Sequence, residues 1–322
     1  MLKSRTAPGL RVRHSRLARR ESLTAYAFMA PQILGLLIFL AGPLIISVYY
    51  TFTKWDLVAP APTWIGLANW RYLFADERIG KVLWNTVRFI LTGTSAFLVL
   101  SLAVAVLVNH GRYGISLIRT LFFLPWVLSQ VAVGSTWKWL FNTRSGPIVQ
   151  LFRLFGARSP EWLLDARYAM IAIAIAATWQ ALGFAMTVYL AGLQGIPSHL
   201  YDAAKVDGAN AWQRFRYVTL PSLSPVIFFL TVTSLIAAFQ LYDPVVMMTS
   251  GGVGIQPGGP KDSTRTIVLY LVNQMFNYNE KLSGLGYAAT IAWVLAALIF
   301  AVTIVQWVTS RWWVFYAGEE ER

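Results

Sequence analysis

A single carboxylate stands among polar and aromatic neighbours near the end of a long uncharged stretch. Asp243 follows Gln240 and Tyr242 in the order FQLYDP. Ionisable side chains at membrane depth are rare and usually face a cavity, so this group predicts the lining of a solute pathway. The simpler alternative is that Asp243 only ends a helix at the membrane surface, where a carboxylate costs little. Trp179 and Gln180, in an earlier uncharged stretch, are weaker candidates for the same lining.

Turn and capping signals, rather than reactive groups, distinguish the stretch IPSHLYDAAKVDGANAWQRFRYVTLP. Ser198 offers its hydroxyl as an N-cap, and Asp202 lies near the start of the predicted helix, where the helix dipole favours an anion. Three residues with small or apolar side chains share one face of that helix: Leu200, Ala203 and Ala204. Gly208 predicts a left-handed terminator, Asn210 can cap a second short helix, and Pro221 limits that helix. We therefore expect a helix–turn–helix whose alanines let another protein approach closely.

Neither a catalytic constellation nor a nucleotide site is visible in the chain. There is no cysteine, and the three histidines lie apart without the partners of a metal site: His14, His110 and His199. The Gly80-Lys81 pair is followed by Val82, so the GxxxxGK[ST] phosphate cradle is missing. The sequence therefore predicts no catalytic residue, no metal and no cofactor in this chain.

The composition and the spacing of charges predict a membrane protein. Of 322 residues, 57% are hydrophobic and 13% charged, about half the charged share of a soluble domain. Six stretches without a charged side chain each reach about 18 residues, enough to cross a hydrocarbon layer as a helix. They lie within residues 26–53, 89–109, 120–137, 168–201, 217–242 and 282–310. Because backbone groups in lipid must pair internally, we predict an all-α integral membrane protein with six transmembrane helices.

Prolines and basic residues add detail to this topology. Four prolines predict local kinks in or at the ends of the spans: Pro31, Pro43, Pro125 and Pro225. The net charge is +13, and seven basic residues precede the first span: Lys3, Arg5, Arg11, Arg13, Arg16, Arg19 and Arg20. Such a tail marks the cytoplasmic side, in preference to a nucleic-acid arm, and an even number of spans places both termini there. We expect a cytoplasmic tail over 1–24, a six-span domain over 25–315 whose 196–221 loop is cytoplasmic, and a C-terminal tail over 316–322.

The spacing within residues 196–221 resembles the coupling-loop signature of binding-protein-dependent permeases. That signature reads Glu-Ala-Ala, three residues, Gly, nine residues, an aliphatic residue, one further residue and Leu-Pro. The matching residues keep every spacing, with Asp for Glu and Val for Ile: Asp202-Ala203-Ala204, Gly208, Val218 and Leu220-Pro221. A second stretch resembles the outward loop of the maltose-type sugar permeases, with an insertion that splits the usual Gly-Gly-Pro: Thr249-Ser250-Gly251-Gly252, Gly259-Pro260 and Ser263-Thr264.

The resemblance implies the permease subunit of an ATP-driven, binding-protein-dependent importer of sugars or sugar-like solutes. It implies a bacterial or archaeal cytoplasmic (inner) membrane, a second homologous permease, two ATPase subunits that bind ATP-Mg, and an extracytoplasmic solute-binding protein. Coupling to the ATPase would fall on the matching residues: Asp202, Ala203, Ala204, Gly208, Leu220 and Pro221. Movement of this loop would then switch the chain between its inward-open and outward-open forms.

The solute pathway and the alternatives follow from the same resemblance. Planar polar groups and aromatic faces bind sugars, so Gln240, Tyr242 and Asp243 suit such a solute, whether an oligosaccharide, a disaccharide or a glycerol-phosphate-type compound. One alternative is a secondary transporter or channel that needs no ATPase. Another is a membrane-bound sugar-transfer enzyme, which would need an acidic cluster at catalytic spacing that the sequence does not show.

Overall fold

The structure, a computed structural model, describes the whole chain except residues 1–15, 111–113, 251–256, 277–283 and 316–322. Most of the predicted basic tail and the predicted C-terminal tail lie outside the described residues. Gly251 and Gly252 of the predicted outward loop also lie outside them. The described chain is predominantly helical, and its one described sheet is an antiparallel hairpin of β1 (Thr53–Lys54) and β2 (Thr63–Trp64).

In chain order, the helices run from α1 at the N-terminal end to α15 at the C-terminal end. The first half contains α1 (Arg16–Leu36), η1 (Leu37–Ala41), α2 (Gly42–Tyr50), α3 (Ala68–Ala75), α4 (Glu77–Phe89), η2 (Ile90–Thr94), α5 (Ser95–His110), α6 (Ile115–Val127), α7 (Gln130–Leu140) and α8 (Pro147–Leu154). The second half contains α9 (Ala169–Gln194), α10 (Ser198–Val206), α11 (Ala211–Arg214), η3 (Phe215–Thr219), α12 (Leu220–Phe239), α13 (Asp243–Thr249), η4 (Pro260–Asp262), α14 (Ile267–Met275) and α15 (Leu285–Ser310). Of the η elements, η1, η2 and η3 are π-turns that join neighbouring helices into longer ones.

Five helical stretches are long and apolar enough to cross a membrane. They are Glu21–Tyr50, Glu77–Asn109, Ala169–Gln194, Ala211–Phe239 and Leu285–Ser310. Each overlaps one of the predicted spans, but the second begins well before the uncharged stretch, at Glu77. The first turns of this helix are amphipathic and carry charged side chains, so the stretch without charges covers only its later part.

The third predicted span is not one straight helix. α6 ends at Val127, α7 begins at Gln130, and the two are bent by 99° at the break. Leu128 and Ser129 between them have ψ angles of 146° and 135°, which are extended values. The N–H of Leu128 still donates to the carbonyl of Pro125 at 3.2 Å, so α6 runs through its proline and breaks only after Val127. The prediction of a continuous helix over 120–137 is therefore wrong: the described residues hold five spans, or six if the bent pair counts as one.

α9 is the centre of the bundle. It packs against α5, α6 and α12, and it contributes many of the buried side chains. Two glycines allow this packing. A Cβ at Gly183 would lie 1.9 Å from the carbonyl oxygen of Phe122 in α6, and one at Gly192 would meet Val226 and Leu223 of α12 at 2.8 and 2.9 Å. The backbones of α6 and α9 are therefore in direct contact, and side chains of α12 pack directly on the backbone of α9.

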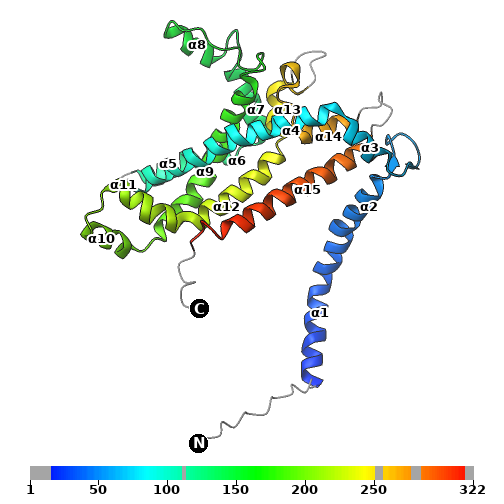
Figure 1. Cartoon of the computed structure of the whole chain (residues 1–322), viewed down its shortest axis with the longest axis horizontal. Helices are drawn as coiled ribbons and strands as arrows, with labels where there is room; N and C mark the ends of the chain where they lie inside the picture. Colours follow the sequence, from blue (N-terminus) through cyan, green and yellow to red (C-terminus); the bar gives the residue numbers. More distant parts are fainter. Residues whose placement is uncertain (1–15, 111–113, 251–256, 277–283, 316–322) are drawn as a thin grey trace, which may run out of the picture.

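The first span stands apart from the bundle. Figure 1 shows α1 and α2 as one long arm that leaves the other helices near α3 and runs away from them. None of the most apolar part of this arm is buried, and Phe28 is 82% exposed. A large contiguous apolar surface of this kind marks contact with lipid or with another protein.

Candidate functional site

The predicted coupling loop, residues 196–221, begins with the exposed helix α10. Figure 1 shows α10 and α11 at one end of the bundle, where α12 begins, while α13 and α14 lie at the other end. The residue before α10 is Pro197, whose extended backbone starts the helix without a side-chain hydrogen bond. The prediction that Ser198 caps the helix is therefore wrong, because Ser198 is already its first residue. No residue of α10 is fully buried, so the whole helix is accessible.

Gly208 ends α10 in the conformation that its position predicts. Its φ angle is +77°, in the left-handed region, and its N–H donates to the carbonyl of Lys205 at 3.0 Å. The N–H of Ala209 donates to the carbonyl of Ala204 at 2.9 Å. These two bonds form a Schellman motif, which satisfies the last carbonyls of the helix. The left-handed terminator is confirmed, and the space where a Cβ would stand is empty.

The second half of the loop differs from the prediction in one respect. Asn210 caps α11 through a reciprocal pair of bonds with Gln213, at 2.9 and 2.7 Å, as its position predicts. Pro221, however, does not end this helix, because α11 runs through the π-turn η3 directly into α12. The loop is therefore a short exposed helix followed by the start of a long span.

The residues that match the signature fall into two places. Asp202, Ala203 and Ala204 lie on α10 with Gly208 at its end, and Asp202 forms an ion pair with Lys205 at 2.9 Å. The hydrogen bond from Lys205 holds the pKa of Asp202 below its usual value. Leu220 and Pro221 instead begin α12, where they are half-buried. The structure thus places the first group on an exposed helix and the second inside the span that the helix leads into.

The predicted pathway residues surround a cavity of about 490 Å³ between η2, α6, α9, α12 and α13, here called the chamber. Four of the five predicted residues line it: Gln180, Gln240, Tyr242 and Asp243. Gln240 ends α12, and Asp243 opens α13, so Asp243 both begins a helix and faces the chamber. The fifth, Trp179, is not in the lining. Its ring packs against Trp137, with centroids 5.7 Å apart and an interplanar angle of 70°.

Gln180 has a partner that explains its position. Its side-chain amide donates to the carbonyl of Leu128 at 3.2 Å, at the break between α6 and α7. An extended residue leaves this carbonyl outside the helical ladder, and a buried carbonyl without a partner is costly. Gln180 therefore fixes the bent third span as well as facing the chamber.

Several chamber residues were not identified from the sequence. Trp126 and Phe184 stack with centroids 4.9 Å apart and an angle of 19°, which gives the chamber a flat aromatic wall. Further polar groups come from all sides: Thr94, Gln130, Thr178, Thr233 and Ser234. One signal was available, because Thr233 and Gln240 are seven residues apart and share a face of the otherwise apolar α12.

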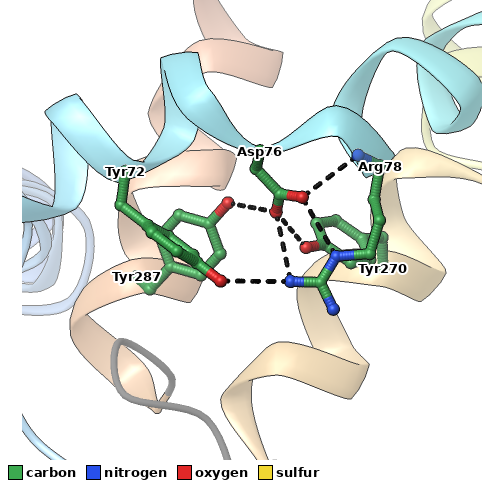
Figure 2. Close-up of polar contacts among 5 residues, drawn as sticks. All are labelled: Tyr72, Asp76, Arg78, Tyr270 and Tyr287. Atoms are coloured by element: carbon green, nitrogen blue, oxygen red, sulfur yellow. Dashed lines mark hydrogen bonds and ion pairs between the residues drawn. The ribbon is translucent and has the colours of Figure 1, made fainter.

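A second polar cluster, absent from the sequence predictions, lies at the corner between α3 and α4 (Figure 2). The Asp76 side chain is 4% exposed and accepts hydrogen bonds from Tyr270 and, at 2.8 Å, from Tyr287. The Arg78 backbone N–H and guanidinium also donate to it, at 3.1 and 3.0 Å, and the guanidinium donates to the Tyr72 hydroxyl at 3.2 Å. Burial alone would raise the pKa of Asp76, but the bonds from Arg78, Tyr270 and Tyr287 outweigh it and hold that pKa below its usual value. We call these five residues the Asp76 cluster.

Comparison with known proteins decides the family. Residues 97–314, which include α6, α9, α12 and α13 of the chamber and the coupling loop, match the family described as "Binding-protein-dependent transport system inner membrane component". The chain belongs to this family. It is therefore a permease of a binding-protein-dependent transport system, as the spacing of the loop residues predicts.

Similar permeases match over nearly their whole length. YesP of Bacillus subtilis, named a probable ABC transporter permease protein, is 36% identical over 312 residues, which are 96% of this chain and 97% of YesP. The lactose transport system permease LacF of Rhizobium radiobacter is 33% identical, with 92% and 97% covered. The trehalose/maltose transport system permease MalF of Thermococcus litoralis is 28% identical, with 91% and 96% covered.

Solved structures agree on the fold. A chain of a bacterial ABC transporter involved in the import of the acidic polysaccharide alginate superposes with a TM-score of 0.76 at 21% identity, covering 92% of this permease and 99% of that chain. A chain of a bacterial alginate transporter in complex with an alginate pentasaccharide-bound periplasmic protein also gives 0.76, at 19% identity, covering 93% and 98%. At these identities the likeness establishes the fold alone.

Proposed function

We propose that this permease forms the solute path of an ATP-driven importer for sugars or sugar-like solutes, driven through residues 196–221. The observation that carries the proposal is the arrangement of α10, which lies exposed at one end of α9 and α12, two of the helices that line the chamber. The names of the relatives, which include lactose and trehalose/maltose permeases, support a sugar as the solute.

The exposed helix α10 suits a groove on an ATPase subunit. Val206 is 87% exposed, and Leu200 and Trp212 of the same loop are also exposed, so the loop offers several apolar side chains to a partner. The empty space beside Gly208 leaves room for a partner backbone. Two ATPase subunits with ATP-Mg would close on ATP binding, and each would pull one such helix. In this proposal α10 and both termini are cytoplasmic.

The apolar arm of α1 and α2 supports a second permease as a partner. The described bundle leaves this arm uncovered along its apolar length. α6, which faces the chamber, also exposes a row of apolar side chains: Leu117, Leu121 and Leu124. Two homologous permeases that share these surfaces would close the chamber from both sides. Residues 25–315 then act as one domain, and an extracytoplasmic binding protein would dock at the end that carries α8 and α13.

The chamber suits a polyhydroxylated solute. The stacked rings of Trp126 and Phe184 offer a flat apolar face, while Gln240, Tyr242 and Asp243 offer hydrogen-bonding groups nearby. Binding sites for small molecules commonly combine apolar walls with a few placed polar groups. Rigid-body movement of α9 and α12 would open this chamber first to one side of the membrane and then to the other.

The test is reconstitution of the permease with its partner permease, ATPase subunits and binding protein in liposomes. We expect labelled sugar to enter only when ATP and loaded binding protein are both supplied on their proper sides. Uptake driven by an ion or solute gradient alone, without the ATPase subunits, would instead identify a secondary transporter or a channel.

A further inference from the structure

The coupling loop contains a hydrogen-bonded connection that the signature does not include. The hydroxyl of Tyr201 on α10 lies 3.0 Å from Oγ1 of Thr219, the last residue of the π-turn before α12. Thr219 is 6% exposed, so the contact is shielded from water on one side. Among the described residues of α10, Tyr201 is the one whose side chain hydrogen-bonds to another helical element.

Thr219 has a second partner, at the end of α11. The Thr219 hydroxyl donates to the carbonyl of Arg214 at 3.4 Å, across the wide turn η3. Either hydroxyl can be the donor in the contact between Tyr201 and Thr219, so Thr219 can accept from Tyr201 while it donates to Arg214. The two contacts form a chain from α10 to the end of α11.

The chain of bonds closes on itself. The guanidinium of Arg214 donates to the carbonyl of Ala209 at 2.8 Å, and the N–H of Ala209 donates to Ala204 of α10 at 2.9 Å. The ring thus runs from α10 through Thr219 and Arg214 and back to α10. The other connections from α10 towards α12 run through the turn at Gly208, whose left-handed residue can act as a hinge, and through α9, which precedes α10 in the chain.

We infer that the Tyr201–Thr219 hydroxyl pair is the positioning contact that makes α10 and α12 move as one body. The inference rests on the proposed function, because it concerns how a pull on α10 reaches the chamber. α12 carries the movement along its length to Thr233 and Ser234 in the chamber wall. Neither Tyr201 nor Thr219 lines the chamber, so the role assigned to the pair is transmission from α10 to the chamber.

The experiment measures solute molecules taken up per ATP hydrolysed in the reconstituted complex. Tyr201→Phe and Thr219→Val each remove one hydroxyl with little change of shape, and Thr219→Ser keeps the hydroxyl. We expect each of the first two to lower the ratio about fivefold, the effect of losing one hydrogen bond between neutral groups. The double variant should lose no more than Thr219→Val alone, since that variant already lacks the contact with Tyr201, and Thr219→Ser should stay near the wild-type ratio.

Two matched controls separate transmission from general damage. Tyr217→Phe makes the same change on an exposed tyrosine of η3, and Thr231→Val makes it on a threonine whose hydroxyl bonds only to Ile227 within α12. Both should keep the wild-type ratio. An unchanged ratio for Tyr201→Phe and Thr219→Val, or losses that multiply in the double variant, would overturn the inference. A wild-type complex that shows no ATP-dependent uptake would overturn the proposed function itself, and the inference with it.

Discussion

The Asp76 cluster and the coupling loop each contain an acidic residue paired with a cation nearby in sequence, but they differ in burial. Asp76 is 4% exposed and has Arg78, Tyr270 and Tyr287 as partners from three helices. Asp202 is 66% exposed and has only Lys205, one turn away on the same helix. The first arrangement fixes α3, α4, α14 and α15 to one another, whereas the second leaves α10 free for a partner. The helices at one end of the bundle are therefore hydrogen-bonded to one another, whereas α10 at the other end is accessible to a partner protein.

The largest expected effect is the loss of stability when the Asp76 cluster is changed. Asp76→Asn removes the charge that three donors share, and we expect it to lower the free energy of unfolding by about 3 kcal/mol, as hydrogen bonds to a buried charge imply. Thermal unfolding of the purified permease in detergent measures this. If Asp76→Asn melts at the wild-type temperature, the cluster does not hold the helices together and the comparison fails.

Acid should weaken the same cluster in a defined direction. The folded pKa of Asp76 is lower than the ordinary value of 3.8, so its contribution is fully present above that value and disappears as the pH falls through the folded pKa. The wild-type protein should therefore lose stability more steeply than Asp76→Asn when the pH falls below about 4. Equal slopes for the two proteins would contradict this assignment.

The next largest effect is expected on transport, from a change in the coupling loop. Gly208→Asp introduces a side chain at φ +77° and places an unpaired charge at the proposed ATPase contact. We expect ATP-driven uptake to fall about a hundredfold, with membrane insertion unchanged. Gly156→Asp is the matched control, because Gly156 has φ +68° and equally empty space but follows α8. Wild-type uptake by Gly208→Asp would refute the role of this loop.

A smaller effect is expected in the chamber between the two ends. Asp243→Ala removes a carboxylate from the lining and should raise the KM for solute about tenfold, the effect of losing a charged hydrogen bond, while the complex still assembles. Asp243→Asn keeps a hydrogen-bonding group, so its KM should lie between those of the wild type and Asp243→Ala. Unchanged uptake kinetics in Asp243→Ala would show that this residue only begins α13.

The smallest effect sharpens the contrast with Asp76. Asp202→Asn breaks an exposed ion pair within one helix, and such pairs contribute little to stability. We expect no measurable change in the melting temperature of the permease alone. A melting temperature lowered as far as that of Asp76→Asn would show that α10 contributes to stability as the Asp76 cluster does.

Short-range features were predictable from the sequence, and long-range ones were not. Gly208 and Asn210 act within a few residues of themselves, so the left-handed turn and the helix cap were identified correctly. The break after Val127 was missed because the residues at it, Leu128 and Ser129, are ordinary, and the carbonyl of Leu128 finds its partner in Gln180, 52 residues later.

The same limit explains the two polar sites. Gln180 and the group from Gln240 to Asp243 could be chosen because polar residues are conspicuous in apolar spans, but Trp179 could not be assigned to a helix face without the packing of α7. Asp76 is recognisable as a residue before a helix. Its tyrosine partners lie 194 and 211 residues away, and only the fold brings them to it.

The absence of cysteine from the chain allows a direct test of the central claim, that α10 is held by the ATPase. Val206→Cys places one thiol on α10, and Leu154→Cys places one on α8, at positions that are 87% and 83% exposed. In the assembled importer, a short thiol-reactive crosslinker should join the ATPase subunit to position 206 and leave position 154 unlinked. Crosslinking of the ATPase at position 154, or labelling of position 206 from outside intact cells by an impermeant reagent, would contradict the account.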